Sequence, residues 1–225
     1  MRAELPAALL WDFDGTLVDS EDSWGRAQSR LMASWGLAWT EDDSQGAVGQ
    51  SNLETALLML GMAGRDLARA PEVALLLNDY ALEDMVRAGT PFRPGARELL
   101  AEAVDAGVPC ALVSATYTGV LTTVLEDLPI SLFGAVVGGD QVTRSKPAPD
   151  SYLLAAERLG VRAADCLALE DSIPGTASAW AAGCVVVGIP YKLALDEGPR
   201  RPLVPTLDGL GLDALARLWR EHRDA

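Results

Sequence analysis

The stretch from residue 9 to residue 20, LLWDFDGTLVDS, constrains the fold more than any other part of the chain. Three apolar residues run into Asp12 and Asp14, two carboxylates separated by one residue. In a strand, alternate side chains point to the same face, so we expect Leu10, Asp12 and Asp14 on one side. Two acids at the end of a buried strand are costly unless a cation uses their charge. The alternative interpretation is a strand end whose acids are simply solvated.

The rest of the chain predicts an α/β fold. From residue 91 onward, helical segments alternate with short apolar runs, which we expect to be strands at residues 108–115, 134–140, 166–172 and 184–190. Such alternation is typical of a Rossmann-like parallel sheet covered by helices on both faces. Between about residues 20 and 90 there is no strand-like run, and the spacing of apolar residues predicts helices at 19–35, 52–60 and 71–87. Loops are expected between these helices, including residues 40–49.

This change of pattern divides the chain into two expected domains. We expect residues 1–19 and 92–225 to form an α/β core domain and residues 20–91 to form a small all-helical cap domain inserted after the first strand. Ligands of such sheets bind beyond the carboxyl ends of the strands. Because the insertion leaves the chain directly after the first strand, we expect the cap to lie over that edge of the sheet.

Polar side chains at the ends of three expected strands mark a candidate site. They are Asp12 and Asp14, Ser114, and Glu170 with Asp171. If the three strands are neighbours in the sheet, these groups meet at one edge. The sequence therefore predicts a site built from carboxylates and a hydroxyl.

Charge and composition narrow the classes of partner. The 225 residues carry 18 basic and 32 acidic side chains, a net charge of −14, which repels nucleic acid and anionic membrane surfaces. No apolar stretch approaches the roughly 20 residues of a membrane span, and charge comes too early at the N-terminus for a signal peptide. We expect a cytoplasmic monomer that has no nucleic-acid or membrane partner and acts on a small molecule.

Scarce residue types limit the available chemistry. The three cysteines, Cys110, Cys166 and Cys184, lack CxxC spacing, which favours buried, inert thiols over a thiolate zinc site. The single histidine, His222, lies near the C-terminus, so the chemistry falls to carboxylates, hydroxyls, lysine and a hard metal. Lys146, in RSKPAPD, is one of only two lysines. It is either a solvated surface charge or part of the site.

Four ordered motifs resemble those of the haloacid dehalogenase superfamily. They are DFDGTLVDSE at residues 12–21, Ser114, SKPAPDSY around Lys146, and LEDSIPG at residues 169–175. The resemblance covers nearly all of the expected core, and the helical insertion resembles the small cap of that superfamily. Within it, the chain is similar to the β-phosphoglucomutase-like and sugar-phosphate phosphatase branch.

The resemblance implies a Mg²⁺-dependent phosphatase acting on a small-molecule phosphate ester, such as a sugar phosphate, through an aspartyl-phosphate intermediate. It implies that Asp12 is the nucleophile and that Asp14 is the general acid and then the base. True dehalogenases resemble this core but lack the second aspartate, so Asp14 indicates phosphate esters. A non-catalytic binding protein on the same fold is an alternative, which the intact set of Asp12, Asp14 and Asp171 disfavours.

The same resemblance implies roles for the other strand-end residues. Ser114 and Lys146 are expected to hold the transferring phosphoryl oxygens. The groups implied for Mg²⁺ are oxygen ligands, which this ion prefers: Asp12, the backbone carbonyl of Asp14, and Asp171, with Glu170 as a further ligand or directly behind them.

The cap departs from the pattern of the mutase. Trp24 stands where the mutase has a histidine, and Val48 and Asn52 stand where it has a lysine and an arginine. Without these cations the cap is poorly equipped to hold a second phosphate, which favours a phosphatase over the alternative of a β-phosphoglucomutase-type phosphomutase. Trp24, Gln50 and Asn52 are candidates for contacting the leaving group; the alternative is that they only pack the cap on the core.

Overall fold

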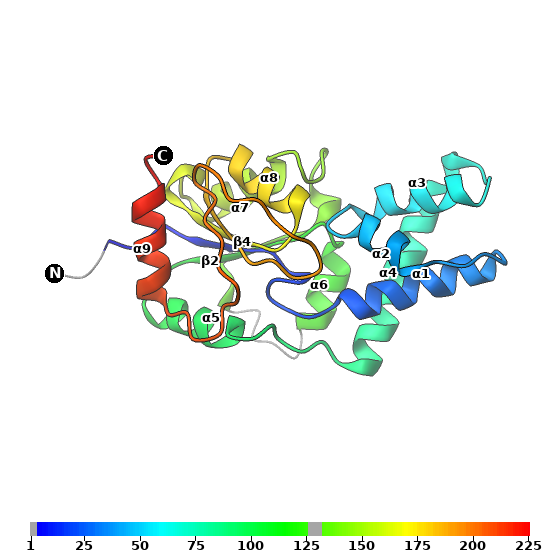
Figure 1. Ribbon diagram of the computed structural model, residues 1–225, viewed down its shortest axis with the longest axis horizontal. Helices are drawn as coiled ribbons and strands as arrows, with labels where there is room; N and C mark the ends of the chain where they lie inside the picture. The colour runs from blue at the N-terminus through cyan, green and yellow to red at the C-terminus, as the bar shows by residue number, and fades with distance from the viewer. Residues whose placement is uncertain (1–3, 126–131) are drawn as a thin grey trace.

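The structure, a computed structural model, describes residues 4–125 and 132–225 (Figure 1). Its centre is a five-stranded parallel sheet with the order β3-β2-β1-β4-β5. The strands are β1 (Leu9–Trp11), β2 (Cys110–Val113), β3 (Ala135–Val137), β4 (Leu167–Glu170) and β5 (Val185–Gly188). The first strand of the chain is therefore the central strand of the sheet, paired with β2 on one side and β4 on the other.

Helices cover both faces of this sheet. They are α5 (Ala96–Asp105), α6 (Thr118–Val124), α7 (Asp150–Leu159), α8 (Ile173–Ala181) and α9 (Leu212–His222). Leu9, Trp11 and Phe13 pack with α5 and α9 on one face, whereas Leu10 packs with α7 and α8 on the other. The predicted Rossmann-like sheet with helices on both faces is confirmed. The sequence also predicts a helix at residues 118–128, whose last three residues lie outside the described part of the chain.

Between β1 and α5 the chain is helical, as the apolar spacing predicted. The elements are α1 (Glu21–Ser34), α2 (Glu41–Ala47), α3 (Asn52–Met62), a 3₁₀ turn (Leu67–Arg69) and α4 (Ala70–Ala88). These helices lie together at one end of the molecule (Figure 1), with α1 and α3 packed against α4. Leu31, Met59 and Leu77 are buried where they meet. The division into a core of residues 1–19 and 92–225 and a cap of residues 20–91 stays a prediction.

One expectation for this segment is wrong. Residues 40–49 were expected to form a loop, but they contain α2. A capping box begins the helix: Thr40 Oγ1 accepts from the backbone N–H of Asp43 at 3.2 Å, and the Asp43 carboxylate accepts from the N–H of Thr40 at 2.8 Å. Apolar periodicity missed α2 because a seven-residue helix with one buried residue, Ala47, has almost no apolar stripe.

The helices of residues 21–88 rest on the sheet domain through a small apolar seam. Trp24, Ala81 and Met85 pack against Val120 of α6. The loop before α3 comes equally close to the core, because a Cβ on Gly49, whose φ is +74°, would lie 2.7 Å from Cβ of Ser172. This loop therefore closes over the carboxyl end of β4.

The longest described helix is α4, with 19 residues. It carries charged residues along its length, including Glu72, Asp79, Asp84 and Arg87. In the part of the chain that the structure describes, no helix combines the length and the apolar composition that crossing a bilayer requires.

Candidate active site

Asp12 directly follows β1 at the centre of the sheet. Its backbone N–H donates to the carbonyl of Leu169 in β4 at 3.0 Å, and the residue is only 5% exposed. The chain then turns at Gly15, whose φ is +82° and where a Cβ would lie 2.2 Å from Oδ2 of Asp171. Only glycine tolerates both the positive φ and this approach. The turn therefore brings Asp171 against the segment that carries Asp12.

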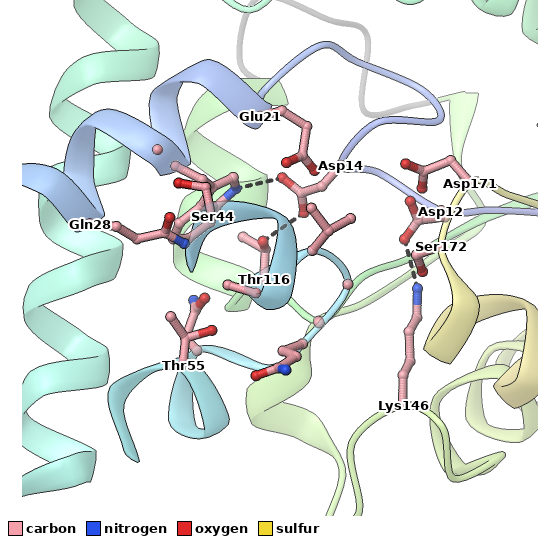
Figure 2. Close-up of a pocket in the computed structure, with 18 residues that line it drawn as sticks. Asp12, Asp14, Glu21, Gln28, Ser44, Thr55, Thr116, Lys146, Asp171 and Ser172 are labelled. Atoms are coloured by element: carbon pink, nitrogen blue, oxygen red, sulfur yellow. Dashed lines mark hydrogen bonds and ion pairs between the residues drawn. The ribbon is translucent and has the colours of Figure 1, made fainter. Parts of the chain in front are cut away.

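Lys146 is the cation at the centre of this site (Figure 2). Its Nζ lies 2.6 Å from Oδ1 of Asp12 and 2.6 Å from Oε1 of Glu170, and the side chain is buried. Asp12, Glu170 and Asp171 bring carboxylate oxygens within 4.8 Å of one another. Three carboxylates around one ammonium leave two negative charges in a buried place, which is costly unless a further cation binds.

The pKa shifts follow from this crowding. Burial, followed by the charge of Glu170, raises the pKa of Asp12 well above its ordinary value even though Lys146 opposes the shift. Burial and then Asp12 raise the pKa of Asp171 in the same way. Burial acts to lower the pKa of Lys146, but the carboxylates of Asp12 and Glu170 outweigh it and raise that pKa. Lys146 therefore stays protonated, and its single positive charge does not balance the three carboxylates around it.

The two acids at the end of β4 differ in their hydrogen bonds. Oε1 of Glu170 accepts from Lys146 and from the hydroxyl of Tyr152 at 2.8 Å, and Oε2 accepts from the backbone N–H and the hydroxyl of Ser172 at 3.3 and 3.1 Å. By contrast, the buried Oδ2 of Asp171 has no partner among the described residues. An unpartnered carboxylate oxygen beside Asp12 fits a hard cation with oxygen ligands.

Asp14 turns away from Lys146 and is held by hydroxyls and an indole. Its carboxylate accepts four hydrogen bonds: from Ser20 Oγ at 2.6 Å, Trp24 Nε1 at 2.8 Å, Ser114 Oγ at 3.0 Å and Thr116 Oγ1 at 2.7 Å. Ser20 and Trp24 follow β1, whereas Ser114 and Thr116 follow β2. The pairing of these two strands therefore brings the four donors around Asp14. The four donors fix the orientation of the carboxyl group.

A pocket opens above these acids, between the sheet and the helices of residues 21–88 (Figure 2). The core side of its lining is Asp12, Asp14, Ala115, Thr116, Lys146, Asp171 and Ser172. The remaining lining residues come from α1, from α2 and the loop after it, and from α3: Glu21, Trp24, Gly25, Gln28, Ser44, Ala47, Val48, Gly49, Gln50, Asn52 and Thr55. A ligand there would touch the charged cluster at one end and the helical segment at the other.

The core residues expected from the sequence meet at one edge of the sheet, although their catalytic roles stay predictions. Asp12, Asp14, Lys146 and Asp171 line the pocket. The other two lie behind these residues: Ser114 donates to Asp14, and Glu170 accepts from Lys146.

The three candidates from the helical segment also line the pocket. Trp24 donates its ring N–H to Asp14, a contact that a wall for the leaving group does not require. Gln50 donates to the carbonyl of Gly46 at 2.7 Å, and Asn52 donates to Oδ1 of Asn78 at 2.9 Å. Contact of these three residues with a leaving group stays a prediction.

Four of the residues that sequence reasoning missed lie close to the acids of the site. Ser20 and Thr116 hold Asp14, Tyr152 holds Glu170, and Glu21 lines the pocket. Burial, followed by the charge of Asp14, raises the pKa of Glu21 to about 7. Ser20, Glu21 and Tyr152 lie within the recognised motifs, and Thr116 follows β2 as Ser114 does. The sequence shows that these residues lie near the motifs, but it does not show where each side chain points.

Comparison with known proteins agrees with this geometry. Residues 6–183, most of the chain, match the haloacid dehalogenase-like hydrolase family. The chain is a haloacid dehalogenase-like hydrolase. The matched segment contains all four motifs, including the turn at Gly15 and the end of β4, so the expected family is confirmed.

Relatives of this hydrolase include named phosphatases. It is 35% identical over 213 residues to the plasmid-encoded protein CbbY of Cupriavidus necator, covering 84% of this chain and 80% of that protein. It is 34% identical over 202 residues to hexitol phosphatase B of Escherichia coli, covering 84% and 86% of the two chains.

Solved structures resemble the hydrolase over almost its full length. The crystal structure of CbbY from Rhodobacter sphaeroides in complex with phosphate has a TM-score of 0.84 and 27% identity, and the match covers 94% of this chain and 99% of that one. A β-phosphoglucomutase from Clostridium difficile, at 20% identity, has a TM-score of 0.86 with 98% and 100% covered, which shows the fold alone. The CbbY and hexitol phosphatase relatives confirm the expected β-phosphoglucomutase-like and sugar-phosphate phosphatase branch.

Proposed function

We propose that this hydrolase is a Mg²⁺-dependent phosphatase that releases inorganic phosphate from a small phosphorylated metabolite of the sugar-phosphate kind. The observation that carries the proposal is the setting of Asp12, a buried carboxylate 2.6 Å from the ammonium of Lys146 at the base of a pocket. Asp14, two residues later, lines the same pocket. The phosphatases among the relatives support the assignment.

The acidic cluster fits a divalent cation. Asp12 and Asp171 would hold Mg²⁺ with the backbone carbonyl of Asp14, because the unpartnered Oδ2 of Asp171 and the excess negative charge both call for one. Glu170 already accepts hydrogen bonds on both oxygens, so it supports Lys146 from behind. When bound, the ion neutralises charge on the phosphoryl oxygens and on the attacking carboxylate.

The residues of the chain then divide the reaction between them. Asp12 attacks phosphorus and forms an aspartyl-phosphate while the bond from phosphorus to the leaving oxygen breaks. Asp14 gives a proton to that oxygen. In the second step Asp14 takes a proton from a water that attacks phosphorus, which breaks the bond to Asp12 and releases phosphate. Lys146, with Ser114 near Asp14, would orient and neutralise the phosphoryl group.

Residues 20–91 would act as a cap domain, and residues 1–19 and 92–225 would form the core domain. Closure of the cap over β4 would keep bulk water from the aspartyl-phosphate until the leaving group departs. Its lining residues include no lysine or arginine among those described. This favours hydrolysis over a mutase cycle, in which a bisphosphate must be held at both ends.

Three further expectations belong to this proposal. A net charge of −14 disfavours nucleic acid and anionic membrane surfaces as partners. A cytoplasmic location is proposed from the composition, and a monomeric state is proposed with it.

The test is phosphate release from a panel of phosphorylated metabolites and p-nitrophenyl phosphate, with Mg²⁺ and with EDTA. We expect Mg²⁺-dependent release that EDTA abolishes. A parallel incubation with a hexose 1-phosphate and a bisphosphate activator separates the alternatives, since a mutase yields the isomeric hexose phosphate. Tight ligand binding with no turnover of any ester would instead indicate a binding protein.

A further inference from the structure

The two walls of the pocket carry different chemistry. The cap wall, defined as the lining residues Trp24 to Thr55, presents amides and hydroxyls and no charged group: its polar members are Trp24, Gln28, Ser44, Gln50, Asn52 and Thr55. The charged lining residues are those near the reacting phosphate, together with Glu21 at the start of α1. The space for the leaving group is therefore polar but offers no positive charge.

Several polar atoms on the cap wall are free to bind a ligand. Gln28 accepts from the indole of Trp39 at 3.0 Å, and Asn52 donates to Asn78 at 2.9 Å, which fixes both amides. Within residues 4–125 and 132–225, no protein partner is found for Nε2 of Gln28, Oδ1 of Asn52 or the hydroxyl of Thr55. These residues are 7%, 7% and 3% exposed, so donors and acceptors are held in place without being used.

The cations near the pocket are already engaged. Lys146 is the one cation among the described lining residues, and it pairs with two carboxylates. Arg26 and Lys192 line a neighbouring groove, where Arg26 pairs with Asp84 at 2.7 Å and Lys192 lies 3.7 Å from Asp22. A second anionic group on a substrate would find no free cation on the cap wall.

Glu21 adds a negative charge to the same space. It is half-buried, lines the pocket, and its carboxyl group points toward Asp14 (Figure 2). The reaction proposed above uses Asp12 and Asp14 and assigns no role to Glu21. A carboxylate in this place accepts hydrogen bonds from hydroxyls and repels other anions.

We propose that the pocket selects phosphate monoesters of neutral polyhydroxylated alcohols, and that Glu21 is the residue that rejects leaving groups bearing a second negative charge. The inference rests on the phosphatase activity proposed above. The hydroxyls of such an alcohol would pair with the free atoms of Gln28, Asn52 and Thr55. A carboxylate or a second phosphate would lose its water and meet Glu21, whose nearby cation, Lys192, is shared with Asp19 and Asp22.

The test compares substrates that differ only in a terminal charge. Glucitol 6-phosphate and 6-phosphogluconate differ by CH₂OH against carboxylate at the far end, as do glycerol 3-phosphate and 3-phosphoglycerate. Both members of each pair are assayed at the same pH, 8, with Mg²⁺ present. We expect kcat/KM to favour the neutral member of each pair by about tenfold or more. This is the scale of the repulsion between the Glu21 carboxylate and one terminal anion of a substrate in the same pocket.

The Glu21→Gln variant isolates the charge. It keeps the size of the side chain and one acceptor oxygen but removes the charge, and we expect the preference within each pair to fall by about tenfold. Asp79→Asn is the control, because Asp79 is an exposed acid of the same helical segment, lies outside the pocket lining and pairs with no cation among the described residues. In that variant the preference should stay as in the parent protein. A second variant, Asn52→Leu, should lower turnover of glucitol 6-phosphate more than that of p-nitrophenyl phosphate, which has no hydroxyl for Asn52.

The possible results separate the two proposals. Turnover of p-nitrophenyl phosphate together with equal or better use of the anionic substrates would overturn this inference and leave the phosphatase standing. A preference that is unchanged in Glu21→Gln would also overturn the role of that residue. No Mg²⁺-dependent release from any ester, p-nitrophenyl phosphate included, would overturn the phosphatase and this inference with it.

Discussion

The two walls of the pocket contrast in how their polar groups are held. On the core wall, Asp12 and Lys146 are buried, charged and paired at 2.6 Å, and Asp14 accepts four hydrogen bonds. On the cap wall, Gln28 and Asn52 are neutral, and each amide is held by a single hydrogen bond within the described residues, with one side-chain atom left free. The first wall is organised for one phosphoryl group, whereas the second can accept more than one alcohol.

The contrast indicates that the core wall carries the reaction and that the cap wall sets the choice of substrate. Charges on the core wall hold one another in place, so removing one leaves its neighbours uncompensated. Neutral groups on the cap wall can be exchanged at much smaller cost. We therefore expect changes on the core wall to abolish the reaction and changes on the cap wall to alter its substrates.

The largest effect is expected for Asp12→Asn. A neutral amide cannot attack phosphorus, so kcat should fall by at least about three orders of magnitude. The measurement is Mg²⁺-dependent phosphate release, with circular dichroism to confirm that the variant is folded. Release within tenfold of the parent protein would contradict the nucleophile assignment.

The next effect is expected for Asp171→Asn and for metal removal. Both should abolish turnover, because the unpartnered Oδ2 of Asp171 is the atom offered to Mg²⁺. Thermal unfolding gives a second measurement: Mg²⁺ should raise the Tm of the parent protein and leave the Tm of the variant nearly unchanged. An equal rise in both proteins would remove Asp171 from the metal site.

The same variant also tests a predicted pH dependence of the stability of the metal-free protein. Since burial raises the pKa of Asp171 in the folded state, the metal-free parent binds more protons folded than unfolded at this site. Its unfolding free energy should therefore fall as pH rises above the unfolded pKa of about 4, and the cost is complete above the raised folded pKa. In EDTA, Asp171→Asn should show a weaker loss of Tm between pH 5 and pH 8. An identical pH dependence in the two proteins would contradict the burial effect.

A smaller effect is expected for Trp24→Phe, which lies between the two walls. The change keeps an aromatic ring and removes the N–H that donates to Asp14 at 2.8 Å. If Trp24 positions the general acid, kcat for glucitol 6-phosphate should fall about tenfold, and p-nitrophenyl phosphate, which needs little acid help, should change less. If Trp24 only walls the pocket, Trp24→Ala should change relative kcat/KM among alcohols while the phenylalanine variant behaves as the parent protein. An equal loss for every substrate in both variants would reduce Trp24 to packing.

The smallest effect on catalysis is expected behind the cap wall, at Asp84. Burial acts against its charge, but hydrogen bonds from Arg26 and Ser23 hold the pKa of Asp84 below its ordinary value. Its contribution to stability is thus present above the unfolded pKa of about 4 and lost as pH falls through the lower folded pKa. Asp84→Asn should cost about 1–3 kcal/mol of unfolding free energy at pH 7 with kcat nearly unchanged. Glu83→Gln, which breaks an exposed ion pair with Arg30, is the control and should cost less than about 1 kcal/mol. If kcat of Asp84→Asn fell as far as in a core-wall variant, the expectation that Asp84 affects stability and not catalysis would be wrong.

Local patterns in the sequence determined the elements and the identity of the reactive groups. Apolar runs that end in polar residues located β1, β2 and β4, and apolar spacing located α1, α3 and α4, because the periodicity of buried residues can be read from consecutive positions. Four motifs of fixed composition identified the family, and the missing cap cations at Val48 and Asn52 were visible in the chain itself.

Only the tertiary structure decided which groups meet and how each is used. The order β3-β2-β1-β4-β5 places Thr116 against Asp14 and Lys146 against Asp12 from more than 100 residues away. No local pattern encodes which strands become neighbours, since that choice depends on how all the helices pack on both faces. The direction of Glu21 into the pocket and the different surroundings of Glu170 and Asp171 likewise arise from packing, because adjacent residues with the same charge diverge once partners from distant segments surround them.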